Sequence, residues 1–318
     1  ITVVETPSRR AVVSPASLGA GPDFEHSLGW LNQAERPLII AGLDVLTHRA
    51  EANLRRLAEQ LNAPLITTYK AKGVLLPEDH ALALGGAGLS PVADEHLLGL
   101  DGEADVILAA GYDPIEMRAG WQNPWPAGSR VIDFSAVANT HYMHQAAINF
   151  VGDVASGLNA LGESVQPGTR WPDGELEAAA AALRQAFPRD EEWGPSAVID
   201  ECRARTPRDT VATVDAGAHR ILLSQMWGCY APRGLLRVTD QSASSGILFV
   251  GVGQQEGSFY PGAGQADAPP VVAISGAAAA EAVVACRRSA AASRYRWSAG
   301  LRPAPHSATR TGTNTSRV

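Results

Sequence analysis

The chain has 318 residues, of which 45% are apolar and 19% charged, with a formal net charge of −7. This length predicts about two domains of a globular protein, and the lack of a long apolar run excludes a membrane-spanning segment and favours the cytoplasm. Residues 1–281 carry 19 Lys and Arg against 33 Asp and Glu, a balance that argues against nucleic-acid binding by the folded part.

Residues 1–36 are interpreted as a linker and the remnant of a preceding domain. They open with the apolar segment 1–4 and continue through several prolines and glycines. A short helix is predicted over 24–34, leading into the first strand of the next domain.

Residues 37–165 are predicted to form a doubly wound, mostly parallel, Rossmann-like α/β domain. Short apolar runs alternate with helical patterns, as in parallel strands joined by crossover helices. Thr47 is the predicted N-cap of a helix that runs to about Asn62, and Pro64 ends it. The five predicted strands are 38–41, 65–68, 106–110, 131–134 and 148–151.

Three residues of this domain are candidate ligand contacts. Lys72, together with Lys70 in the segment Lys-Ala-Lys-Gly that ends at Gly73, can meet a phosphate, although a solvated loop is the favoured interpretation. Gly86, in a Gly-Gly-Ala-Gly segment, allows a ligand to approach the backbone, but a plain turn is favoured because no strand-GxGxxG-helix context is evident. Asp113 follows the strand 106–110 at the edge where open parallel sheets bind ligands, and Asp113-Pro114 also suits a turn, so both interpretations stay open.

Residues 166–194 are predicted to be a linker with a helix over 175–187. A partial second α/β domain is then expected over 195–276, with a strand at 210–214 and a helix at 220–227. The three cysteines (Cys202, Cys229 and Cys286) form no CxxC pair, which argues against a zinc site or a disulfide framework.

The turn after the strand 210–214 carries Asp215, Gly217, Ala218 and His219. Backbone N–H groups and the helix dipole favour an anion such as a phosphate at a strand-to-helix turn. The glycine permits close approach and the histidine can donate a hydrogen bond. Taken alone, an Asp or His in a turn is more often a cap or a surface residue.

Together with their surroundings these residues resemble the thiamine pyrophosphate-dependent enzymes of the acetolactate synthase, pyruvate oxidase and benzoylformate decarboxylase group. Residues 36–161 resemble the central domain of that family, most closely at 104–116 (ADVILAAGYDPIE). Residues 213–219 (TVDAGAH) resemble the start of the pyrophosphate domain. The segments 232–236 and 269–276 fall where that domain continues.

The resemblance implies decarboxylation or ligation of 2-keto acids, with thiamine pyrophosphate as the electron sink and Mg²⁺ as the metal. It also implies assembly into a homodimer or homotetramer. On this interpretation Asp215, Gly217, Ala218 and His219 lie on the diphosphate side of the cofactor. Lys72, Gly86 and Asp113 belong to the central domain, which holds a flavin nucleotide in some relatives; FAD is not expected here.

The chain departs from the family pattern at decisive points. The pyrimidine domain with its activating glutamate has no counterpart beyond residues 1–5. The GDG metal motif falls on Gly276-Ala277-Ala278, and methyl groups offer Mg²⁺ no oxygen ligand. No catalytic residue and no metal ligand are therefore assigned, and the segment 237–257 replaces the glycine-rich segment of the family.

Residues 277–318 are predicted to be disordered. They include 12 Ala, 7 Arg, 5 Ser and 4 Thr but a single acid. The preferred hypothesis is a shifted reading frame of a GC-rich gene, and a basic nucleic-acid-binding arm is the alternative.

Two functions follow from the sequence. The first is a truncated or degraded thiamine pyrophosphate-dependent enzyme, inactive by itself. The second is a non-catalytic, Rossmann-like module that binds a nucleotide or a partner protein. No membrane or nucleic-acid partner is expected for either.

Overall fold

The computed structural model describes residues 21–237 and 271–274. Within the first range, short gaps fall at 74–78, 118, 127, 140–142, 169, 173, 188, 190–193 and 215–217. The predicted tail 277–318, the altered segment 238–257 and residues 1–20 lie outside the described residues. Among the residues that are described, no helix is long and apolar enough to cross a membrane.

A six-stranded sheet with parallel pairing throughout forms the centre of the first part of the chain. The strand order β3-β2-β1-β4-β5-β6 confirms the predicted doubly wound α/β fold, in which the direction of winding reverses between β1 and β4. The strands are β1 Pro37–Ala41, β2 Leu65–Thr68, β3 Ala83–Ala87, β4 Val106–Ala110, β5 Arg130–Ser135 and β6 Ile148–Val151.

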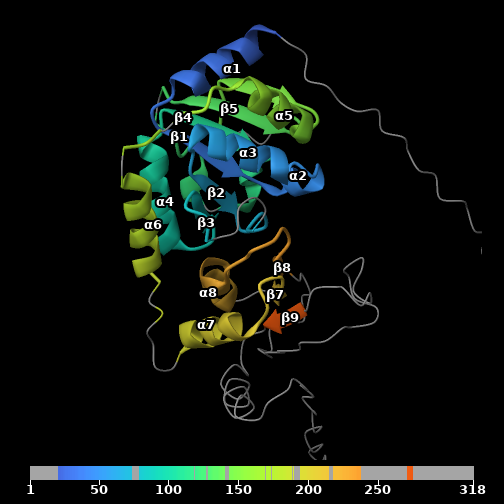
Figure 1. Cartoon of the computed structure of the whole chain (residues 1–318). Coiled ribbons are helices and arrows are strands. Elements are labelled where there is room, and N and C mark those ends of the chain that lie inside the picture. Colours follow the sequence, from blue (N-terminus) through green and yellow to red (C-terminus); the bar gives the residue numbers. More distant parts are fainter. Residues whose placement is uncertain are drawn as a thin grey trace, which may run out of the picture.

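Helices cover both faces of this sheet (Figure 1). The helices α3 and α5 pack against each other on one face, and α4 packs with α6 on the other. The helices of this part are α1 Pro22–Gln33, α2 Leu43–Thr47, α3 Glu51–Leu61, α4 Pro91–Glu103, α5 Val154–Ser164 and α6 Glu175–Gln185, with short 3₁₀ helices at η1 Pro114–Glu116 and η2 Ala119–Trp121.

The core explains why the apolar runs of the sequence become strands. Every residue of β1 and of β4 is buried, as expected for the middle of a parallel sheet covered on both faces. Helix α3 buries a stripe of four residues at helical spacing: Leu54, Leu57, Ala58 and Leu61. Helix α1 contributes Phe24 and Leu31 to the same core.

Two local predictions are wrong. Thr47 does not start a helix; it ends α2, and its hydroxyl donates to the carbonyl of Leu43. The break before α3 falls at Arg49, which takes the left-handed conformation at φ 54° and so cannot continue a helix. The predicted turn at 85–88 is instead mostly strand β3, with a register shift opposite Leu65 and Ile66.

A second, three-stranded parallel sheet follows in the order β8-β7-β9. Its core includes Val198, Cys202, Leu223 and Trp227, and the buried Cys202 and Cys229 are not joined in a disulfide. The elements are α7 Pro195–Arg205, β7 Val211–Val214, α8 Ala218–Met226, β8 Leu235–Arg237 and β9 Val271–Ile274.

Candidate functional site

The carboxyl ends of β1 and β4 approach each other closely where the winding of the large sheet reverses. Gly42 follows β1 and donates its N–H to the carbonyl of Ala110 at 2.9 Å. A Cβ atom on Gly42 would lie 2.2 Å from the carbonyl oxygen of Gly111, so only glycine permits this contact. Gly111 has φ +55°, a left-handed conformation that glycine adopts without strain.

A pocket of about 170 Å³ opens at this edge, which we call the switch-point pocket. Two carboxylates line it, and each accepts a hydrogen bond from a backbone N–H group. Asp44 accepts from the N–H of Ala136 at 3.2 Å, and Asp113 accepts from the N–H of Ile115 at 3.0 Å. Among the described residues that line it there is no lysine or arginine, which disfavours a phosphate group. Its lining residues are Leu43, Asp44, Thr68, Gly111, Tyr112, Asp113, Ser135, Val137, Ala138 and Asn139.

Four polar atoms in the lining of the switch-point pocket are buried and have no hydrogen-bond partner in the part of the chain that the structure describes: Thr68 Oγ1, Tyr112 Oη, Ser135 Oγ and Asn139 Oδ1. Burial raises the pKa of Tyr112 far above its ordinary value, so its hydroxyl is a donor at any physiological pH. Buried polar atoms of this kind require a partner, which suits water or a neutral ligand with hydroxyl groups or ring nitrogens.

A buried acid and base lie next to this pocket. The carboxylate of Asp133 lies 3.5 Å from Nε2 of His144, and both side chains are fully buried. The amide nitrogen of Asn139 lies 2.9 Å from the same His144 atom. Sequence reasoning missed this pair because Asp133 is a single polar residue within an apolar strand and His144 lies in an irregular segment.

Lys72 does not lie in a solvated loop; only 1% of it is exposed. Its ammonium group donates to the carbonyl oxygens of Ser224 at 2.7 Å and Gln225 at 3.3 Å, in the last turn of α8. A cation is favoured there because the last carbonyls of a helix lack intrahelical partners and carry its negative dipole end. Gln225 in turn donates to the carbonyl of Gly86 at 3.0 Å, so Lys72 and Gly86 both hold the junction between the two sheets.

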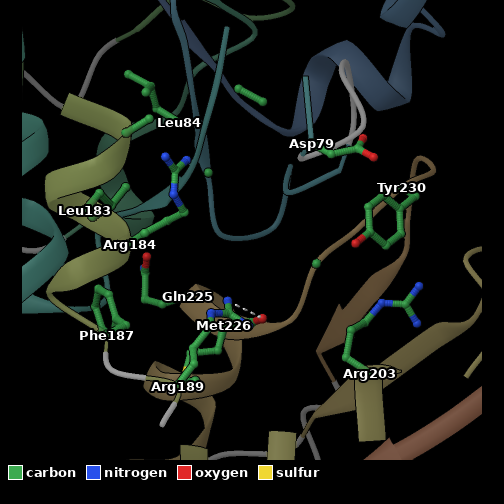
Figure 2. A pocket seen from close by; sticks show the side chains of 14 residues that line it. Asp79, Leu84, Leu183, Arg184, Phe187, Arg189, Arg203, Gln225, Met226 and Tyr230 are labelled. Atoms are coloured by element: carbon green, nitrogen blue, oxygen red, sulfur yellow. Dashed lines mark hydrogen bonds between the residues drawn. The ribbon is translucent and has the colours of Figure 1, made fainter. Parts of the chain in front are cut away.

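A pocket of about 290 Å³ lies at the same junction, between α6, β3 and α8 (Figure 2). Two of its three arginines are engaged by neighbouring groups. Arg189 pairs with Asp200 and donates to the carbonyl of Met226 at 3.1 Å. Arg203 donates to Thr206 and lies 4.9 Å from the centre of the Tyr230 ring. The apolar part of the pocket wall consists of Leu84, Leu183, Phe187 and Met226. We interpret this pocket as part of the packing between the two sheets.

A third pocket, of about 200 Å³, borders the end of β7, and we call it the β7 pocket. Two cationic side chains line it. Lys70 lies in the segment after β2 of the large sheet, and Arg220 lies in α8, which follows β7 of the second sheet. None of the described residues that line it is acidic. The full lining is Leu43, Tyr69, Lys70, Val214, Arg220, Ser224, Leu235 and Leu236.

The residues predicted from the sequence are distributed over three places. Asp113 lies in the switch-point pocket, whereas Lys72 and Gly86 lie at the junction. Ala218 and His219 open α8, next to the β7 pocket in the chain, and Asp215 and Gly217 lie outside the described residues. The structure therefore does not bring Asp113 and Lys72 into one site.

The described residues supply no evident metal centre, since no three His, Cys, Asp or Glu side chains among them gather closely enough to hold an ion. The segment Gly276-Ala277-Ala278, where the family resemblance puts the metal motif, lies outside the described residues. Lys70 was a candidate phosphate contact together with Lys72, but sequence reasoning missed Tyr69 and Arg220, because their convergence with Lys70 depends on the contact between two segments about 150 residues apart. The available signal was a basic residue close to each predicted site in the chain: Lys70 near Lys72, and Arg220 directly after His219.

Comparison with known proteins gives a consistent result. Residues 24–161 match the family described as "Thiamine pyrophosphate enzyme, central domain". A probable acetolactate synthase of Mycobacterium bovis is 31% identical over 231 residues, which cover 68% of this chain and 39% of that protein. The acetolactate synthase of Bacillus subtilis is 26% identical over 79% of this chain and 44% of its own length.

A probable 2-ketoarginine decarboxylase of Pseudomonas aeruginosa is 28% identical over 237 residues, which cover 72% of this chain and 40% of that protein. The chain thus spans less than half the length of each of these relatives.

Proposed function

Because the chain belongs to the thiamine pyrophosphate-dependent enzyme family, we propose that it supplies the central domain and the opening part of the cofactor-binding domain of an enzyme acting on 2-keto acids. The observation that carries the proposal is the match over residues 24–161, followed in the same chain by a second parallel sheet. The first strand of that sheet, β7, runs into Asp215-Ala216-Gly217-Ala218-His219. The substrate class is taken from the relatives, which include a 2-ketoarginine decarboxylase.

The residues present fit the anionic end of the cofactor better than its metal. Lys70 and Arg220 line the β7 pocket, and two cationic side chains in one cavity favour an anion such as a diphosphate. A divalent cation finds no group of three ligating side chains among the described residues, and Ala277 and Ala278 offer none in the sequence. When bound, thiamine pyrophosphate supplies an electron sink for the loss of carbon dioxide from a 2-keto acid.

We propose accordingly that these 318 residues bind the cofactor weakly and do not complete a catalytic cycle by themselves. An activating glutamate would have to come from a pyrimidine domain outside these 318 residues, and we propose assembly as a dimer or larger. Light scattering with and without thiamine pyrophosphate measures the assembly.

Thermal unfolding with thiamine pyrophosphate tests the cofactor. A ligand at 100 times its dissociation constant adds about 2.7 kcal/mol to the free energy of unfolding, so a melting-temperature rise that appears only at millimolar cofactor supports weak binding. No rise at saturating cofactor, with or without Mg²⁺, would contradict the proposal.

A second function, a module that binds a nucleotide without catalysis, is favoured by the switch-point pocket. That pocket lies at the position where doubly wound sheets bind nucleotides and contains four unpartnered polar atoms. Its two carboxylates suit a ribose or a base rather than a phosphate. Calorimetric titration with adenosine and ADP, in wild type and in Ser135→Ala, measures this function separately from cofactor binding.

A further inference from the structure

The packing between the two sheets leaves a cavity of about 290 Å³ at their junction, which we call the junction pocket (Figure 2). Its walls come from both parts of the chain, since Leu84 lies in β3 and Leu183 in α6, whereas Met226 ends α8. Pockets that bind small molecules often lie at such boundaries. None of the described residues that the sequence predicted as ligand contacts lines this pocket.

The apolar wall of the junction pocket is incompletely covered. Leu183 and Phe187 are large apolar side chains, four positions apart, and both are only partly buried. Phe187 packs against the core of the first sheet and against the core of the second, so the pocket borders both cores. Water next to apolar surface is released when an apolar group takes its place, and each CH₂ group buried in this way is favourable. The wall therefore suits an aliphatic chain.

A guanidinium group lies beside this apolar wall. Arg184 is an exposed residue of α6, and its side chain lines the pocket next to Leu183 in the chain (Figure 2). It forms no ion pair and no side-chain hydrogen bond within the described residues. A planar guanidinium group matches the two oxygens of a carboxylate, so Arg184 can hold the charged end of a ligand whose chain enters the pocket.

The other charged side chains described in the lining already have partners. Arg189 and Arg203 are engaged by the groups named above, and Asp79 accepts from Arg208 at 2.7 Å. A ligand therefore does not have to break an existing ion pair to reach Arg184. Exposed ion pairs contribute little affinity, so the apolar chain should supply most of it and Arg184 should select the sign of the charge.

We propose that the junction pocket binds a small amphipathic carboxylate, a molecule with one carboxylate group and a short aliphatic chain. The carboxylate pairs with Arg184, and the chain lies against Leu183, Phe187 and Met226. Because these residues belong to both parts of the chain, the bound ligand holds the two sheets together at their junction. The site is separate from the pockets invoked in the proposed function and does not depend on that function.

Isothermal titration of the full chain with concentrated sodium hexanoate, at constant ionic strength, tests the inference. A dissociation constant of about 1 mM is expected for a ligand with so few non-hydrogen atoms. Butyrate, which has two fewer CH₂ groups, should bind about tenfold more weakly. Hexylamine has the same chain length and the opposite charge, and it should not bind.

Two substitutions separate the charged contact from the apolar contact. Arg184→Gln should weaken hexanoate binding about fivefold, because it removes an exposed ion pair. Leu183→Asn should weaken it by about the same factor, because it removes part of the apolar wall. Arg55→Gln is the matched control: it changes an exposed arginine of α3, on the other face of the large sheet, and should bind hexanoate as wild type does.

Arg184 is exposed, so its variant should melt at the temperature of wild type. If Leu183→Asn melts at a lower temperature, the Arg184 variant and the comparison with butyrate decide the question. Equal binding of hexanoate by wild type and Arg184→Gln, or equal binding of hexanoate and hexylamine, would show non-specific adsorption and overturn the inference. So would the absence of hexanoate binding. Binding of thiamine pyrophosphate is measured separately, so the proposed function can fail or stand independently of this site.

Discussion

The ammonium nitrogen of Lys72 lies 2.7 Å from the carbonyl oxygen of Ser224, although 152 residues separate the two in the chain. This contact places the buried ammonium group of Lys72, which follows β2 of the large sheet, at the C-terminal end of α8. The first residues of α8, Ala218 and His219, belong to the turn that was predicted to bind the cofactor. The junction between the sheets is therefore specific, since only a long cationic side chain can satisfy those carbonyls from this distance.

Lys72→Met should destabilise the junction. The substitution keeps the apolar stem but leaves the carbonyls of Ser224 and Gln225 without their donor, at a cost of about 2 kcal/mol. Urea unfolding measures the loss. Lys70→Met is the control. Because Lys70 is only half-buried, this substitution should lower the free energy of unfolding by no more than about 0.5 kcal/mol. Equal stability of the Lys72 variant and wild type would show that the contact contributes nothing.

Gly42→Ala should disrupt the reversal of the large sheet. The new methyl group would lie 2.2 Å from the carbonyl oxygen of Gly111 and 2.6 Å from the Cα of Tyr112, and both are backbone atoms that cannot rotate away. We expect a loss of about 3 kcal/mol in the free energy of unfolding. Gly29→Ala, in α1, meets no atom within 4 Å and should instead stabilise the chain by about 0.5–1 kcal/mol.

Asp101 should make stability depend on pH. Its side chain is buried in α4 with neither oxygen hydrogen-bonded within the described residues, and burial raises its pKa to about 7. Between pH 4 and 7 the unfolded chain is ionised while the folded chain holds its proton, so stability falls as pH rises through that interval and is constant above it. The total effect is at most about 4 kcal/mol.

Asp101→Asn removes this ionisation. The variant should be more stable than wild type at pH 8 and should lose that advantage at pH 4, as measured by thermal unfolding at both values. Glu95→Gln changes an exposed acid of the same helix and should leave the pH dependence as in wild type. A pH profile of Asp101→Asn parallel to that of wild type would exclude the ionisation of Asp101 as the cause.

Trp171→Phe should loosen the attachment of the segment before α6. The indole Nε1 of Trp171 donates to the carbonyl of Pro37 at 2.8 Å in a buried position, so the substitution leaves an unpaired carbonyl at the start of β1. The expected loss is about 1–2 kcal/mol in urea unfolding. Trp125→Phe removes a longer, more exposed bond to Gln145, and a loss as large as that of Trp171→Phe would argue against burial as the reason.

Much of the large sheet could be predicted from the sequence. Five of its strands contain short, largely apolar runs, and the fully apolar 106–110 is typical of a central strand of a parallel sheet, where both faces are buried. Strand β3 was missed because Gly85 and Gly86 carry no side chains to reveal a strand pattern. The break at Arg49 was missed because a left-handed arginine leaves no compositional signal.

The candidate sites were less predictable. Asp113 was identified from its position after β4, since strand ends are visible in the sequence. The burial of Lys72 and the pairing of Lys70 with Arg220 around Tyr69 depend on contacts between distant segments, which a local pattern does not encode.

The segment 68–72, from the last residue of β2 onward, contributes to all three places discussed above. Thr68 lines the switch-point pocket, Tyr69 and Lys70 line the β7 pocket, and Lys72 closes the end of α8. Inserting or deleting one residue between 68 and 72 would therefore misalign all of them at once. Substitutions in these five positions are expected to be pleiotropic, and adaptation of either pocket to a new ligand is constrained by the other.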